Sequence, residues 1–179
     1  MKARFFKNLL ALAVAVAMAA AAQELCPPLW VGVKAPFLVA VAAYYCVRRE
    51  AEWGAVAAVW CGVVQDGLDG MGWFFGAPLF AGFWAFCQLV IKKQMPDSAA
   101  ACAAAAVALG LAHEVACWMA LRADGLDAGV GARVLVARFL VFAGAAVGAA
   151  LAAAFFAGRA DLALGNVDDG RNGGAYEIG

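Results

Sequence analysis

The stretch Trp60–Gly76, WCGVVQDGLDGMGWFFG, places two carboxylates, Asp66 and Asp69, between long apolar runs. Its glycines are Gly62, Gly67, Gly70, Gly72 and Gly76. A carboxylate this deep in apolar sequence is costly to bury, and inside a membrane such a residue usually marks a working surface or a pairing site. Glycine lets helix backbones approach closely, or it ends a helix. We therefore expect the rest of the chain to hold this stretch at a fixed depth in a membrane.

The composition is that of an integral membrane protein. Of the 179 residues, 66% are hydrophobic, and the mean hydropathy is +0.83. A soluble domain of this size could not bury so much apolar surface. The net charge is zero and the basic residues are scattered along the chain. This pattern excludes nucleic acid as a partner, because nucleic-acid binding needs a clustered basic face.

The hydrophobic pattern predicts an all-α integral membrane protein with six transmembrane helices. The expected spans are residues 5–22, 30–47, 53–69, 71–91, 99–121 and 133–157. Pro36 falls in the first turns of the second span, where the loss of a backbone donor is tolerated. Residues 158–179 are rich in Gly, Asp and Asn, so we expect a disordered cytoplasmic tail there.

The first expected span has a second interpretation. Lys2, Arg4 and Lys7 precede an uncharged run, and small residues precede Gln23. This order is typical of a cleaved secretory signal peptide, yet the run is also just long enough to cross a bilayer. We favour its retention as the first span.

The distribution of Lys and Arg predicts that both termini lie in the cytoplasm. With the N-terminus inside, the inner segments carry nine of these residues and the outer segments carry three. Every inner loop contributes to the excess, as the positive-inside rule requires.

Five ionisable residues map to the outer half of the predicted bilayer. They are Asp66, Asp69, His113, Glu114 and Arg138. Glu114 and Arg138 have opposite charges, lie on consecutive spans and fall at a similar depth, so we expect them to pair. The pair would either act as a gate, relay or partner contact, or fix the helix packing as an interhelical ion pair. The sequence leaves both interpretations open.

Asp66 and Asp69 are three residues apart, so in a helix they share a face and would recruit a cation or a basic partner. We favour a buried role for Asp66 and a solvated outer-loop position for Asp69. His113 is the only histidine, and a lone histidine beside an acid is most often a hydrogen-bonded packing residue. The spacing Gly144-x-x-x-Gly148 indicates close helix packing inside the bundle, with oligomerisation as the alternative.

No enzyme motif is complete. His113-Glu114 begins like the metalloprotease pattern HExxH, but Cys117 stands where the second histidine ligand is expected. Ser98 is the only serine, and no nucleophile elbow surrounds it. The six cysteines form no CxxC pair, and we expect them to be small buried hydrophobic residues. We therefore expect no enzymatic activity, no cofactor and no metal site.

Gly32, Pro36, Gly62, Asp66 and Gly76 belong to short elements between about Gly32 and Val90. In this stretch the chain resembles the bacterial rod shape-determining protein MreD family. Gly32 and Pro36 form a Gly-x-x-x-Pro element, and a short basic turn follows. Gly62 and Asp66 form a Gly-x-x-x-Asp element, and Gly76 lies near the start of the next span. Family members are small six-span proteins, and their fold is similar to that of the substrate-binding subunits of energy-coupling-factor transporters.

The resemblance implies a non-enzymatic subunit of the cell-elongation machinery in the bacterial cytoplasmic (inner) membrane. Its expected partner is MreC, a single-span protein with an external domain, which connects it to MreB, RodA and a penicillin-binding transpeptidase. The expected partner-binding or structural residues are Pro36, Gly62, Asp66, Gly67, Asp69, Gly70, Gly76, Glu114 and Arg138. The alternative is a small-molecule-binding membrane subunit of an energy-coupling-factor type transporter.

Overall fold

The computed structural model describes residues 2–70, 75–94, 98–125 and 131–163, and these residues form helices with no strand among them. In chain order the helices are α1 (Lys2–Leu25), the 3-10 helix η1 (Trp30–Gly32), α2 (Phe37–Arg48), α3 (Ala51–Asp69), α4 (Gly76–Phe86), the π-helix η2 (Cys87–Ile91), α5 (Lys92–Gln94), α6 (Ala99–Ala123) and α7 (Ala132–Ala163). The all-α prediction is confirmed for this part of the chain.

Three helices are long and apolar enough to cross a membrane. They are the segment Phe5–Leu25 of α1, and the whole of α6 and α7. With 12 residues, α2 is about 18 Å long, well short of a hydrocarbon core of roughly 30 Å. The described residues therefore support a helical membrane fold, while the number of six spans stays a prediction.

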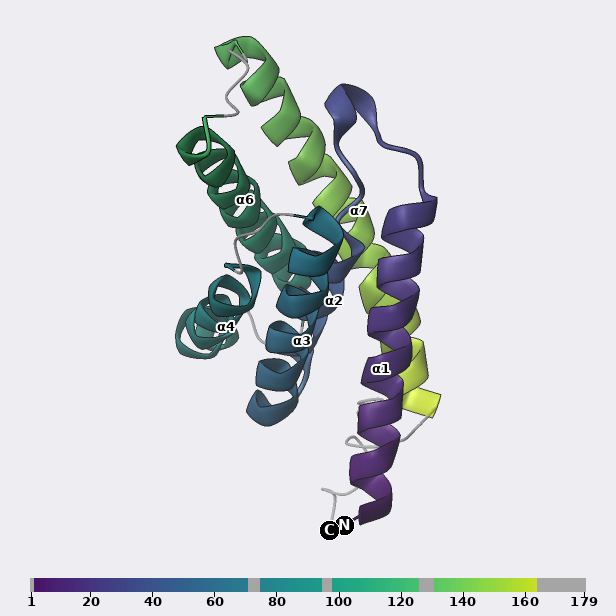
Figure 1. The fold of residues 1–179 in the computed structure, drawn as a ribbon. Helices are drawn as coiled ribbons and strands as arrows, with labels where there is room; N and C mark the ends of the chain where they lie inside the picture. Colours follow the sequence, from purple (N-terminus) through teal and green to yellow (C-terminus); the bar gives the residue numbers. More distant parts are fainter. Residues whose placement is uncertain (1, 71–74, 95–97, 126–130, 164–179) are drawn as a thin grey trace.

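The helix α2 forms the centre of the bundle (Figure 1). Its ten residues from Leu38 to Val47 are all buried. It contacts α1, α3, α6 and α7, which surround it. A helix that is apolar on every side is stable only where other helices cover it, which explains why the shortest of these five helices lies innermost.

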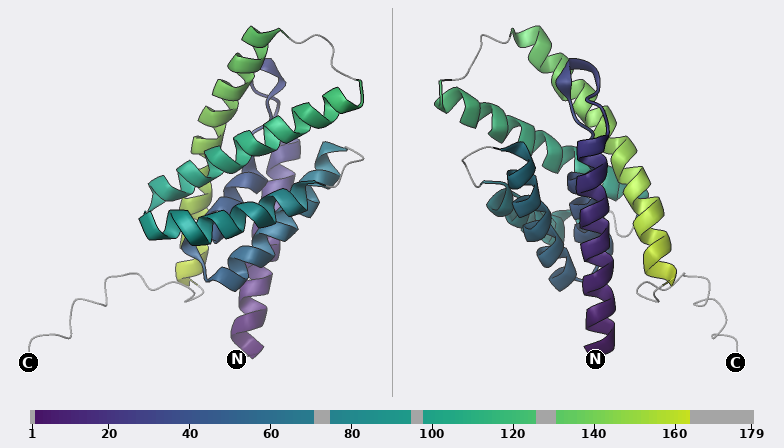
Figure 2. Two further views of the ribbon diagram at one scale, coloured as in Figure 1. Left: turned by 90° about the vertical axis from the view of Figure 1, so that its left-hand side faces the viewer. Right: turned by 45° about the vertical axis from the view of Figure 1, so that its right-hand side comes forward.

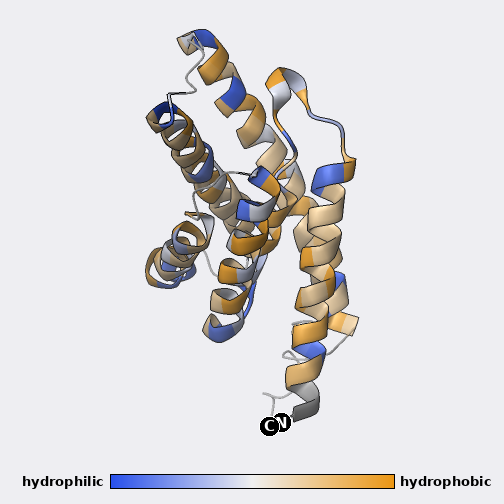
Figure 3. Ribbon diagram, in the orientation of Figure 1, coloured by the Kyte–Doolittle hydropathy of each residue, from blue (hydrophilic) through white to orange (hydrophobic). Residues whose placement is uncertain are grey.

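The remaining helices differ in their inclination to one another. Figure 2 shows α4 and α6 steeply tilted against α1. Hydrophobic colours cover most of the helix ribbons in Figure 3, and hydrophilic colours mark helix ends and single turns within them. The start of α1 and the end of α7 lie at the same end of the bundle (Figure 1). The last residues of α3 lie toward the opposite end (Figure 1).

Within the second expected span, 30–47, the α-helix does not include the first seven residues. Val31 and Gly32 have φ values of +56° and +73°, which no α-helix contains. Pro36 directly precedes α2, and a proline disfavours helical conformation in the residue before it. The helix therefore begins only at Phe37.

Within the fourth expected span, 71–91, the described helix α4 begins at Gly76. From Gly76 the chain continues without interruption through η2 and α5 to Gln94. Residues 71–74 lie outside the described part of the chain, so the expected helix cannot be compared there.

Residues 158–163, expected in the tail from the sequence, are helical. The helix α7 continues through residues 158–163, because Asp161 is held inside the bundle. The Tyr44 hydroxyl donates a hydrogen bond to Oδ2 of Asp161 over 2.9 Å, and Nε of Arg49 lies 3.8 Å from the same oxygen. Buried ionisable groups are thus present at both ends of the bundle, and not only in the predicted outer half. Residues 164–179 lie outside the described part.

Candidate functional site

The carboxylate of Asp66, in the last turns of α3, caps the N-terminus of α4. The Gly76 N–H donates to Oδ1 over 2.8 Å and to Oδ2 over 3.1 Å, and the Ala77 N–H donates to Oδ2 over 3.4 Å. The first N–H groups of a helix lack partners within it and form the positive end of its dipole, so a carboxylate stabilises them. Asp66 is 4% exposed. Its predicted buried position is confirmed, and its oxygens face the chain's own backbone.

Gly62 and Gly76 let α3 and α4 approach closely beside this cap. A Cβ on Gly76 would lie 2.5 Å from Oδ1 of Asp66, and a Cβ on Gly62 would lie 2.7 Å from Cα of Ala77. These separations are too short for any side chain, so a larger residue would push the two helices apart. Three residues of the MreD resemblance, Gly62, Asp66 and Gly76, therefore form one helix–helix contact.

Three other expected site residues lie apart from this contact. Gly70 ends α3 in the left-handed conformation with φ +63°, which glycine adopts without strain. Pro36 sets the start of α2. Gly67 is exposed, and a Cβ there would meet no atom within 4 Å. Gly70 and Pro36 thus determine local chain geometry, whereas Gly67 makes no close contact.

Asp69, the last residue of α3, faces His113 of α6. Its Oδ2 lies 3.2 Å from Nε2 of His113, and its side chain is 25% exposed. Asp69 therefore ends α3 and does not lie in a loop, and its carboxylate reaches α6, while the residue is solvent-exposed as expected. His113 is 4% exposed, and the rings of Phe75 and Phe80 lie beside its imidazole at 5.7 Å and 6.0 Å between centroids.

Cys117 follows His113 by one helical turn and approaches the same imidazole ring. Its Sγ lies 3.7 Å from Nδ1 and 3.8 Å from Nε2 of His113. Residues four apart on a helix share a face, which explains this proximity. The contact between α3 and α6 thus contains a carboxylate, an imidazole and a thiol.

Two glutamines extend this contact across the bundle. Nε2 of Gln65 donates to Oδ1 of Asp69 over 2.9 Å, and Nε2 of Gln23 donates to Oε1 of Gln65 over 3.1 Å. The N–H of Leu38, in the first turn of α2, donates to Oε1 of Gln23 over 3.4 Å. Both glutamine side chains are buried. A continuous chain of polar contacts therefore joins α2, α1, α3 and α6.

Glu114 and Arg138 form the expected ion pair between α6 and α7. Nε of Arg138 donates to Oε2 of Glu114 over 2.8 Å, and Nη2 donates to Oε1 over 3.4 Å. The Glu114 side chain is 14% exposed and that of Arg138 is 40% exposed. This two-point contact joins α6 and α7, so the pairing prediction is confirmed.

Gly144 and Gly148 do not pack inside the bundle. Both are exposed, and a Cβ on either would meet no atom within 4 Å. The expectation of internal packing at this spacing is therefore wrong among the residues that the structure describes.

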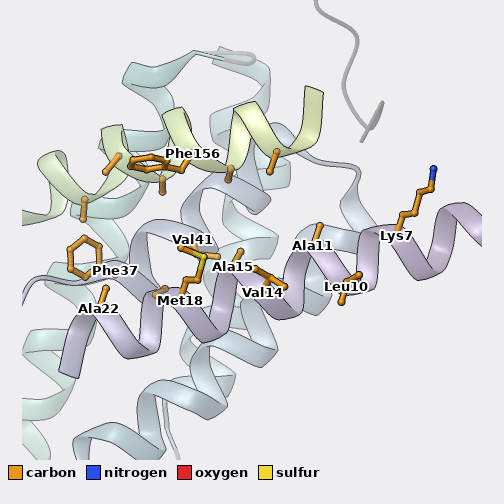
Figure 4. A pocket seen from close by; sticks show the side chains of 16 residues that line it. Lys7, Leu10, Ala11, Val14, Ala15, Met18, Ala22, Phe37, Val41 and Phe156 are labelled. Atoms are coloured by element: carbon orange, nitrogen blue, oxygen red, sulfur yellow. The ribbon is translucent and has the colours of Figure 1, made fainter. Parts of the chain in front are cut away.

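An apolar groove of about 520 Å³ lies between α1 and α7, and Phe37 and Val41 of α2 line it between them (Figure 4). Nine of its sixteen lining residues are alanines. On α1 they recur every fourth residue as Ala11, Ala15 and Ala19, and on α7 as Ala149, Ala153 and Ala157. Lys7 lies at one end of the groove (Figure 4). Such repeated small residues are typical of surfaces on which transmembrane helices pack.

Sequence reasoning missed Gln23, Gln65, Cys117 and the groove. The i, i+4 spacings of Gln65 with Asp69 and of Cys117 with His113 could have indicated these contacts. The partnership of Gln23 with Gln65 and the meeting of α1 with α7 had no local signal, because each depends on how distant helices pack.

Comparison with known proteins adds no relative. No protein-family model matches the chain, and neither a curated protein nor a solved structure matches it.

Proposed function

We propose that this protein is a non-enzymatic membrane scaffold whose groove between α1 and α7 receives the transmembrane helix of a single-span partner. The observation that carries the proposal is the repeat of alanine at every fourth position on both walls of the groove. Helices associate in a membrane where small side chains let their backbones come close. Contact with lipid alone does not require alanine at every fourth position.

The dimensions of the groove suit a helix. From Lys7 to Ala22 its wall on α1 extends over about 22 Å, which is most of the width of a bilayer core. Leu10, Met18 and Phe156 line it and are 66–70% exposed, so they are available to a neighbouring helix.

The partner surface is better placed in the groove than around Asp66. Asp66 is buried, and its carboxylate oxygens accept hydrogen bonds from Gly76 and Ala77. A partner at that position would have to displace these bonds, whereas the groove is open without any change in the chain.

The resemblance to the MreD family supports a specific partner. In that proposal the single-span protein is MreC, the chain crosses the bacterial cytoplasmic membrane six times with both termini inside, and MreC connects it to MreB, RodA and a penicillin-binding transpeptidase. Gly62, Asp66 and Gly76 would then be the structural signature of the fold, because together they determine the crossing of α3 and α4.

The test is affinity capture of the tagged full chain from its native membrane in mild detergent. Ala11→Trp fills the groove, and Ala17→Trp is the matched control, because Ala17 is exposed on the same helix outside the groove. We expect the groove variant to recover at least about tenfold less MreC, which corresponds to roughly 1.4 kcal/mol of binding free energy.

Three outcomes would contradict parts of the proposal. Equal recovery of MreC with both variants would show that the groove contacts lipid and does not bind MreC. Recovery of an ATPase with a membrane coupling subunit would favour the transporter subunit over the scaffold. Absence of MreC from the capture by the unaltered chain would exclude the proposed partner.

A further inference from the structure

Asp69, His113 and Cys117 bring three kinds of metal-ligating atom together between α3 and α6. One ligand atom from each residue lies within 4.8 Å of the other two. The incomplete HExxH pattern therefore retains a possible ligand at its last position, since a thiolate binds zinc as readily as an imidazole. We propose that these three residues form a binding site for a divalent cation of the zinc type.

The distances between the ligand atoms agree with a tetrahedral ion. Metal–ligand bonds of about 2.0–2.3 Å in tetrahedral geometry place neighbouring ligand atoms about 3.3–3.6 Å apart. The Asp69 Oδ2 and His113 Nε2 atoms are 3.2 Å apart, and Nε2 lies 3.8 Å from Sγ of Cys117. Shifts of a few tenths of an ångström bring these two pairs to the ideal spacing. The oxygen and sulfur atoms of Asp69 and Cys117 lie within 4.8 Å of each other.

Neighbouring side chains already hold the ligands in place. Gln65 donates to Oδ1 of Asp69, which leaves Oδ2 directed at His113. The rings of Phe75 and Phe80 lie beside the imidazole of His113. Hydrogen bonds and packing of this kind orient metal ligands and are a normal part of zinc sites.

The charges of the group also suit a divalent cation. On binding, the Cys117 thiol loses its proton to the solvent and becomes a thiolate, while Asp69 is a carboxylate and His113 is neutral. The two negative ligands and the doubly positive ion sum to zero. A neutral complex costs little to bury among apolar helices, whereas an isolated charge there is expensive.

Three protein ligands leave the fourth tetrahedral position for a water molecule. The Asp69 side chain is 25% exposed, so water can reach this corner of the site. The bound ion would fasten the end of α3 to α6. The site shares no residue with the groove between α1 and α7, so its existence is independent of the proposed function.

The test uses Co²⁺ as a spectroscopic substitute for Zn²⁺ in the full chain purified in detergent. We expect one ion per chain, visible bands of tetrahedral cobalt and a thiolate-to-cobalt charge-transfer band that excess Zn²⁺ abolishes. Cys117→Ser should remove the charge-transfer band and weaken binding roughly 100-fold or more, and Gln65→Leu should weaken it roughly 10- to 100-fold through the loss of orientation.

Cys26→Ser is the matched control, because Cys26 is the other cysteine that is only partly buried. This variant should bind cobalt like the unaltered chain. Equal cobalt spectra for Cys117→Ser and the unaltered chain would overturn the site, as would a cobalt spectrum without a thiolate band.

A second measurement does not depend on the folding of any ligand variant. In the Cys26→Ser chain, Cys117 can be alkylated with a maleimide and the modification located by mass spectrometry. We expect Zn²⁺, but not Mg²⁺, to slow alkylation at least about tenfold, since a metal-bound thiolate is withheld from the reagent. An unchanged alkylation rate in saturating Zn²⁺ would exclude Cys117 as a ligand.

Discussion

The hydroxyl of Tyr44 donates a hydrogen bond to Oδ2 of Asp161 across 117 residues of sequence and 2.9 Å of space. This bond attaches the last turn of α7 to α2, and both side chains are almost fully buried. Arg49 lies at the same carboxylate, so the carboxylate has both a hydrogen-bond donor and an opposite charge nearby. The contact explains why a helix rich in alanine continues into a segment with polar residues.

Tyr44→Phe removes the donor and keeps the ring. We expect a loss of about 1–2 kcal/mol in the free energy of unfolding, because the buried carboxylate loses one of its hydrogen bonds. Denaturation in mixed micelles followed by circular dichroism measures this loss. Tyr45→Phe is the control, since the Tyr45 hydroxyl does not donate to Asp161 in the described contacts. Equal losses of unfolding free energy in both variants would show that the Tyr44–Asp161 hydrogen bond does not stabilise the fold specifically.

Gly76→Ala places a methyl group where only 2.5 Å separates the new Cβ from Oδ1 of Asp66. We expect it to destabilise the fold by about 1–3 kcal/mol, because α3 and α4 must move apart. Gly67→Ala is the opposite case, since that position is helical and open. This variant should stabilise the fold by about 0.5–1 kcal/mol, because alanine has a higher helix propensity than glycine. Thermal unfolding of both variants measures the two changes in stability. Shifts of the unfolding temperature in the same direction for both variants would contradict the expectation.

Asp66→Leu leaves the N–H groups of Gly76 and Ala77 without their acceptor inside the bundle. Each unsatisfied donor costs about 1–3 kcal/mol. We expect Asp66→Asn to lose less stability than Asp66→Leu, because the amide oxygen can still accept one of these bonds. Hydrogen exchange should accelerate at the first residues of α4 and not at α6. Unchanged exchange at Gly76 in the leucine variant would contradict the capping role.

The Glu114–Arg138 pair can be measured by a double-mutant cycle with Glu114→Gln and Arg138→Met. The pair is partly exposed, so we expect a coupling free energy of only about 0.5–1.5 kcal/mol. Unfolding in detergent micelles at low and high salt measures the coupling free energy and how far salt screens the ion pair. A coupling of zero at low salt would show that the contact does not determine the packing of α6 against α7.

Much of the helix pattern could be predicted from local sequence. The expected spans 53–69 and 99–121 differ by no more than two residues at either end from α3 and α6. The ion pair of Glu114 with Arg138 could also be predicted, because charges on neighbouring long helices at similar depth have few other partners. The start of α2 is predicted too early, since residues 30–36 carry a single charge, at Lys34, and adjoin the apolar run of the helix.

The sequence by itself determined that the chain is helical and that some of its helices are long and apolar enough to cross a membrane, because apolar composition and helix length are properties of each segment alone. Apart from the Glu114–Arg138 pair, only the tertiary structure decided what the polar residues contact. Backbone N–H groups have no sequence signature, so nothing local identified Gly76 as the partner of Asp66. The same holds for Asp161 with Tyr44 and for the meeting of Asp69 with His113 and Cys117. These distances depend on how separate helices cross, and the crossing is set by close packing over the whole bundle.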